Sequence, residues 1–225
     1  MPTIGEFNRD FAEIIGAEFG SVLKVQRVLR GENLFTTGAR GVNAPDVTTL
    51  DAARMLLAFL VTDRPSLAKR AVVEFGGLGV SLLEHFDADD DPVSGEFAKA
   101  TAEMQTLEEG LVAVIEGFAR LPHAERADRS GAASVSCVTN DMSATLHWPG
   151  GLCIFSNQGS WMEVLAAEGA DLDARRAQLA QVEAEDRAAG AKYLVGARRV
   201  RTDRKVSGDV LAEVAGMFAG ERQDA

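Results

Sequence analysis

The charged residues best suited to binding a partner lie within residues 21–45. This stretch holds four cations, Lys24, Arg27, Arg30 and Arg40, against one acidic residue, Glu32. Long cationic side chains can reach the phosphates and base edges of a nucleic acid. Because the whole chain carries a formal net charge of −11, it has no general attraction for polyanions. Any nucleic-acid binding must therefore be local, and this basic stretch is the candidate surface.

The same stretch predicts an amphipathic helix over residues 22–30. At about 100° per residue, Val22, Val25, Val28 and Leu29 share one arc of the helix. The polar residues spread over the opposite arc, so the helix would pack by its apolar side. An ordinary solvated surface helix followed by a turn has the same pattern, and this alternative stays open.

The segment after this helix extends the pattern. GENLFTTGARG, residues 31–41, places the apolar pair Leu34 and Phe35 before a glycine-flanked tip that carries Arg40. This order over residues 4–62 resembles the winged helix-turn-helix DNA-binding proteins of phages and prophages. The resemblance implies a set of DNA-contacting residues, with the helix in the major groove and the tip on a phosphate or in the minor groove. These residues are Lys24, Gln26, Arg27, Arg30, Arg40 and Asn43.

A second basic patch lies near the C-terminus. It consists of Lys192, Arg198, Arg199, Arg201, Arg204 and Lys205, offset by Asp203. We expect these cations to pair with the acidic segment 84–109, within one chain or between chains. Contact with phosphates is the alternative.

The spacing of apolar residues predicts an α+β fold that is predominantly helical. Steps of three and four predict helices over 4–19, 22–30, 50–62, 65–75 and, as one long helix, 97–120. Alternating patterns at 134–139, 142–148 and 152–156 predict a small antiparallel sheet. A solvated helix at 171–189, a short basic strand at 192–201 and a closing helix capped at Ser207 complete the expected order.

These elements suggest three parts of the chain. Residues 1–86 would form a helical, winged-helix-like module that folds by itself, and the acidic segment 87–96 would be a linker. Residues 97–225 would form an α+β domain for oligomerisation or interaction. The apolar stripes of 97–120 and 171–189 are the surfaces expected to pair copies of the chain.

Motifs for catalysis or metal binding are not evident in the sequence. GGLGV at 76–80 lacks the G-x-G-x-x-G spacing of dinucleotide sites, and the DADDD run lacks the glycine and closing glutamate of an EF-hand. Cys137, His147 and Cys153 lie on neighbouring expected strands but lack metal-ligand spacing, so we expect structural cysteines. We expect no enzymatic activity, no cofactor and no metal.

The composition, 46% hydrophobic and 25% charged, is typical of a globular protein. Apolar runs such as 55–61 are far shorter than the roughly 20 residues of a membrane span. With two cysteines and no basic-then-apolar leader, a cytoplasmic protein without a membrane partner is expected.

The function expected from these patterns is sequence-selective binding of double-stranded DNA by a homo-oligomer, as in transcriptional regulators of phage or prophage type. A small terminase-like subunit that recognises DNA for packaging is one alternative. The other is a non-enzymatic protein that binds other proteins through its acidic surface.

Overall fold

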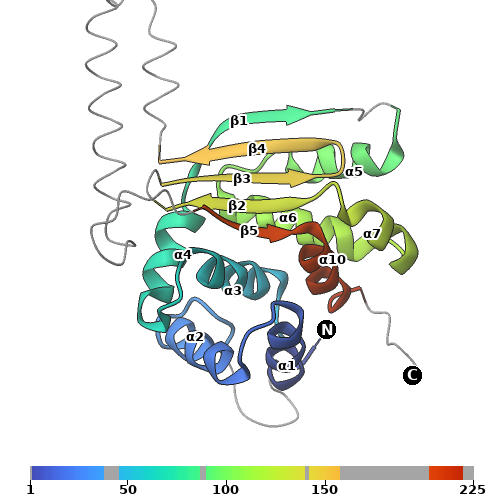
Figure 1. The fold of residues 1–225 in the computed structure, drawn as a ribbon. Helices are drawn as coiled ribbons and strands as arrows, with labels where there is room; N and C mark the ends of the chain where they lie inside the picture. Colours follow the sequence, from blue (N-terminus) through green and yellow to red (C-terminus); the bar gives the residue numbers. More distant parts are fainter. Residues whose placement is uncertain (1, 38–45, 87–89, 140–141, 158–202, 220–225) are drawn as a thin grey trace, which may run out of the picture.

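The structure, a computed structural model, describes residues 2–37, 46–86, 90–139, 142–157 and 203–219. In it, helices pack on one face of an antiparallel sheet and continue below one of the sheet's edges (Figure 1). The fold is therefore α+β and predominantly helical, as the sequence predicts.

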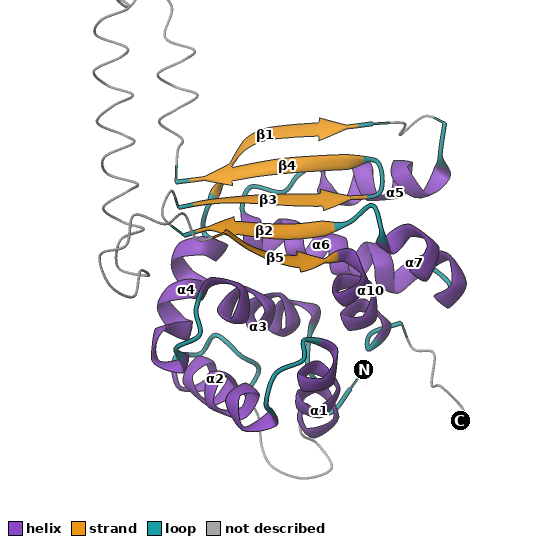
Figure 2. Cartoon of the chain, viewed as in Figure 1, coloured by secondary structure: helices purple, strands orange, loops and turns teal. Residues whose placement is uncertain are grey.

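The described elements follow one another in this order. The N-terminal helices are α1 (Ile4–Ile14), α2 (Phe19–Gly31), α3 (Thr49–Val61), the 3₁₀ turn η1 (Pro65–Leu67) and α4 (Ala68–Gly76). Strand β1 (Gly79–His85) is followed by α5 (Pro92–Thr101), α6 (Leu107–Arg120) and α7 (His123–Ser130). The remaining elements are β2 (Ser134–Val138), β3 (Ser143–Trp148), β4 (Gly151–Ser156), β5 (Asp203–Ser207) and α10 (Gly208–Gly216). The sheet order is β1-β4-β3-β2-β5, and every neighbouring pair is antiparallel (Figure 2).

Local capping signals explain where several helices begin. Thr3, Thr48 and Thr106 each form a capping box, with Glu6, Asp51 and Glu109 respectively, which satisfies backbone amides of the first turn. The buried Asp51 carboxylate also accepts hydrogen bonds from the amide and hydroxyl of Thr36, at 2.7 and 2.6 Å. The segment after α2 is thereby fastened to the start of α3.

Three helix boundaries differ from the sequence expectation. Helix α1 ends at Ile14 because Gly16, at a φ of +64°, adopts the left-handed conformation that interrupts a helix. Helix α2 begins at Phe19, so its first turn includes the residues expected to separate it from α1. The long helix expected over 97–120 is two helices, and the Thr106–Glu109 capping box is the sequence signal that marks the second.

Strand β1 is absent from the sequence prediction, and it alters the expected division of the chain. It pairs antiparallel with β4, so residues 1–86 contribute a strand to the sheet formed by the later residues. The acidic segment expected as a linker is helical from residue 92, and Asp91 caps α5 by accepting from the amides of Val93 and Ser94. One hydrophobic core runs from Phe7 to Ala215 through both parts.

The apolar stripe expected to pair copies of the chain lies inside the molecule. Helix α6 packs against α3, α5, α10 and β3, and its stripe of Leu111, Val114, Ile115 and Phe118 is fully buried. This expectation for 97–120 is therefore wrong, because the stripe is already used in the core. The helix expected at 171–189 and the strand expected at 192–201 lie outside the described residues; β5 begins just after them, at Asp203.

None of the helices that the structure describes combines the length and the apolar character needed to cross a membrane.

Candidate nucleic-acid interface

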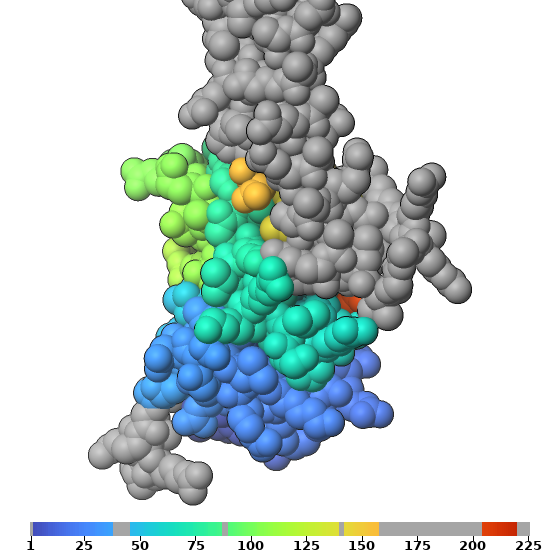
Figure 3. All heavy atoms as spheres, turned by 90° about the vertical axis from the view of Figure 1, so that its left-hand side faces the viewer, coloured from blue at the N-terminus to red at the C-terminus, as the bar shows by residue number. Residues whose placement is uncertain are grey.

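Helix α2 is held in place by the side that faces the core. Val22, Val25 and Leu29 are at most 5% exposed, and the helix packs against α1, η1, α4 and α3. Figure 3 shows the outer surface of the N-terminal helices in blue, next to that of α4 in teal. The apolar arc predicted from the sequence is thus the docking side of the helix.

The cations of α2 occupy its outer side. Lys24, Arg27 and Arg30 are exposed, and within the described part of the chain none of them takes part in an ion pair. Because residues three apart on a helix differ by about 60°, they span roughly 120° with Arg27 at the centre. Many other described cations have acidic partners, in the pairs Arg54–Glu108, Lys69–Glu32, Arg70–Glu74, Arg120–Glu116, Arg129–Asp91 and Arg204–Asp63. The cations of α2, unpaired among the described residues, are therefore available to bind an external anion.

Gln26 does not belong to this outer set. It is 6% exposed, and its buried Nε2 has no hydrogen-bond partner among the residues that the structure describes. Residues four apart lie about 40° from each other on a helix, so Gln26 stacks beside Val22 on the inner side. The expectation that Gln26 faces a DNA groove is therefore wrong.

The segment after α2 departs from the winged-helix pattern. Residues 32–37 form a turn rather than a strand, with Asn33 in the left-handed conformation at a φ of 59°. Phe35 is buried against Phe7, with ring centroids 6.1 Å apart. Arg40 and Asn43, expected at the tip, lie outside the described residues.

The C-terminal basic patch is described only at its end. The guanidinium of Arg204 makes two hydrogen bonds to the carboxylate of Asp63, one of 2.8 Å. The pairing is internal, but its acidic partner lies outside the segment 84–109 in which it was expected. Lys205 is exposed on β5. The structure does not describe the other four members, Lys192, Arg198, Arg199 and Arg201.

The two cysteines and His147 lie on opposite faces of the sheet. Cys137 and Cys153 are buried on the face that packs on the helices, whereas His147 follows the inward-facing Leu146 and points to the other face. Burial raises the pKa of both thiols, that of Cys153 to about 12, so both remain protonated at neutral pH. Burial, and secondarily Lys205, lowers the pKa of His147. These three side chains cannot converge on one ion.

An open groove of about 450 Å³ lies along α6, beside α3 and α5. Its carboxylates already have partners: Glu108 binds Arg54, Glu109 caps α6, and Glu116 accepts from the Thr49 hydroxyl at 2.9 Å. Among the described residues, no group of three potential metal ligands comes together. The outer face of α2 is therefore the stronger candidate site.

Comparison of the chain with known protein families, with curated proteins and with solved structures finds no match. Function is consequently inferred from the chemistry of the surface alone.

Proposed function

We propose that the chain binds double-stranded DNA through the outer face of α2, as a sequence-selective cytoplasmic regulator of phage or prophage type. The observation that carries the proposal is the set of three exposed cations, Lys24, Arg27 and Arg30, without acidic partners among the described residues. They concentrate positive charge on a chain of net charge −11. Such a local field attracts phosphate where the rest of the surface repels it.

The shape of α2 supports the same partner. A helix of 13 residues is about 20 Å long and fits the major groove of B-DNA. Its N-terminus has no side-chain cap, and the space around Gly20 is open. The first backbone amides of α2 can therefore approach a phosphate, while the cations reach bases and phosphates farther along the groove.

We further propose that the chain acts as a homo-oligomer. A single short helix reads few base pairs, and helix-turn-helix regulators commonly extend their site by pairing two heads across a two-fold axis. Selectivity then depends on both the contacts of α2 and the spacing of the two helices.

The decisive experiment compares two double variants with equal loss of charge. Arg27→Ala with Arg30→Ala removes two cations from the proposed interface, and Arg9→Ala with Arg120→Ala removes two exposed cations from α1 and α6. DNA fragments selected by the wild-type chain are titrated at several salt concentrations. Each lost phosphate contact should lower the salt slope of binding by about one unit, and each lost base contact should cost roughly 1–3 kcal/mol.

The matched variant should bind nearly as well as wild type. Equal loss of affinity in both folded variants would show that only net charge matters and would contradict an α2 interface. Failure of the wild-type chain to select any fragment at about 0.1 M salt would favour a protein-binding function instead.

A further inference from the structure

The two edge strands of the sheet, β5 and β1, differ in how far charged residues and neighbouring elements cover them. Edge strand β5 has five residues, packs against α3 and α10, and carries Arg204 and Lys205. Edge strand β1 has seven residues, and the described chain covers only its beginning, where Val80 donates to the carbonyl of Gln105 and Gly79 bridges to Thr106. Charged residues and helix cover protect a sheet edge from further pairing. Edge β5 has this protection, whereas the described residues leave most of β1 without it.

The backbone groups at the open edge of β1 follow from its pairing with β4. The amide of Phe86 donates to the carbonyl of Gly150, on the β4 side of the strand. Since backbone groups of successive residues point to alternate sides of a strand, those of Glu84 and Leu82 also face β4. The amides and carbonyls of Leu83 and His85 therefore face outward, where no described strand lies beside them.

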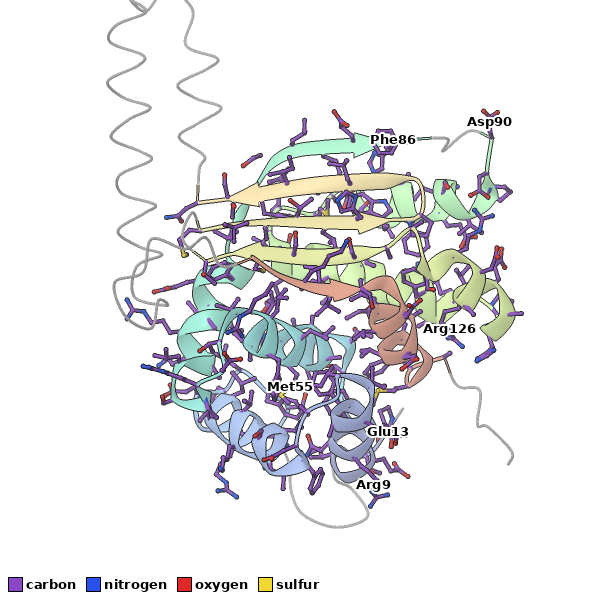
Figure 4. All side chains as sticks on the ribbon, viewed as in Figure 1. Arg9, Glu13, Met55, Phe86, Asp90 and Arg126 are labelled. Carbon is purple, nitrogen blue, oxygen red and sulfur yellow. The ribbon has the colours of Figure 1, made fainter. Side chains whose placement is uncertain are left out.

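Exposed apolar side chains gather beside this edge. Leu82 is 41% exposed, Phe86 45%, and Ile154 of the adjacent strand β4 37%. Leu82 and Ile154 are register partners on the face of the sheet opposite the described helices. Figure 4 labels Phe86 at the end of β1, with its side chain beside the strand. A strand edge that the described elements leave uncovered, with apolar neighbours and neither lysine nor proline, is suited to pairing with another strand.

We propose that β1 pairs antiparallel with β1 of a second copy of this chain, across a two-fold axis centred on Leu83. This pairing assigns a surface to the homo-oligomer proposed above. The inference rests on that proposed function. The edge is its own complement, because the outward donors and acceptors of Leu83 meet the same groups of the second copy. In this register Leu82 lies opposite Glu84 of the second copy, so no two carboxylates face each other. A register centred on Glu84 would bring two carboxylates together.

The register predicts which charge disrupts the pairing. Leu82→Glu places two carboxylates opposite each other on both sides of the axis, and the dimer dissociation constant should rise by about tenfold or more. The matched control is Val73→Glu, which introduces the same charge at a 54% exposed valine on α4, away from the edge. Its dissociation constant should equal that of wild type.

A second pair of variants tests the backbone directly. His85→Pro and His85→Ala both lose the 3.0 Å contact between the imidazole and the Thr101 hydroxyl, but only the proline removes the outward amide. The proline variant should be the weaker dimer by several-fold. This pair keeps the proposal testable if Leu82→Glu does not fold.

All masses are measured by analytical ultracentrifugation without DNA, so the result does not depend on whether the chain binds DNA. Wild type should form a dimer of the 24.0 kDa chain at micromolar concentrations. A wild-type monomer, or equal dissociation constants for Leu82→Glu and Val73→Glu, would overturn the pairing and leave the α2 interface untouched. A dimer that fails to select DNA would instead contradict the α2 interface alone.

Discussion

Helix α2 and strand β1 each present a surface that could bind a partner, but α2 offers charged side chains and β1 offers backbone hydrogen-bonding groups. Beyond its first turn the backbone of α2 is bonded within the helix, so most of its outer face can act only through long cationic side chains. The outer edge of β1 has apolar neighbours and backbone groups that no described strand pairs. Glu84 is the one acidic residue of the strand, which has no lysine or arginine. Phosphate suits the first surface, whereas the second suits a polypeptide strand. The two surfaces therefore call for different classes of partner.

Separating α2 and β1 from the later residues of the chain should have the largest effect on stability. Residues 1–86 contain both α2 and β1, but without the later residues β1 loses β4 and α3 loses α6. We therefore expect this fragment to melt without a cooperative transition in circular dichroism, contrary to the self-folding module that the sequence suggests. A sharp melting transition would show that the α2 surface is independent of the sheet.

The two sides of α2 should differ strongly in their effect on stability. Leu29 is fully buried, so Leu29→Ala should lower the free energy of unfolding by about 2–5 kcal/mol. Arg30→Ala, at the next residue on the exposed side, should change it by less than about 0.5 kcal/mol. Urea unfolding measures both values. Comparable losses would mean that Arg30 supports the fold and is not free to meet DNA.

Replacing Gln26 should change the free energy of unfolding by less than Leu29→Ala does, and should raise it. Within the described part of the chain the buried Nε2 has no hydrogen-bond partner, so Gln26→Leu should raise the free energy of unfolding by about 1 kcal/mol. DNA affinity should not change, because the side chain lies on the inner side of α2. If Gln26→Leu is more stable but binds DNA more weakly, Gln26 takes part in the interface, as the sequence pattern suggests.

The smallest effect on stability concerns Asp91, which caps α5 and binds Arg129 at 2.7 Å. The hydroxyl of Ser94, the Val93 amide and Arg129 lower the pKa of Asp91. Its contribution to stability is therefore present above the ordinary carboxyl pKa of about 4 and is lost as pH falls through the lower folded value. Asp91→Asn keeps a cap but removes the charge, so its melting temperature should fall below wild type at neutral pH. This difference should shrink in acid; a difference independent of pH would exclude the ionised carboxylate as its cause.

Much of the local structure could be predicted from short-range patterns. Thr48 before an apolar stretch marks the start of α3, and the alternation within residues 134–156 marks β2, β3 and β4. The helix after Ser207 is also confirmed, with Ser207 at the N-cap position, but its side chain makes no capping hydrogen bond. Such features depend on caps, turns and periodicity among residues only a few positions apart, so they can be recognised without knowing the rest of the fold.

The candidate site was predictable to a lesser degree. The exposure of Lys24, Arg27 and Arg30 follows from the helical wheel and is confirmed, whereas their contact with DNA stays a prediction. Gln26 was placed outside because it is polar, but its angle on the helix puts it beside Val22. The pairing of Arg204 with Asp63 joins residues 141 positions apart, and no local pattern indicates it.

The sequence by itself determined the helical stripes, the three-stranded meander and the basic outer side of α2, because each depends on side-chain periodicity within a single segment. Only the tertiary structure decided that β1 joins the sheet as an edge strand of the described sheet and that the stripe of α6 is buried in the core. A register shift between Val80 and Leu82 interrupts the alternation of β1, and its partner β4 lies about seventy residues later in the chain. Which apolar surface is covered, and which is left for a partner, depends on such long-range packing.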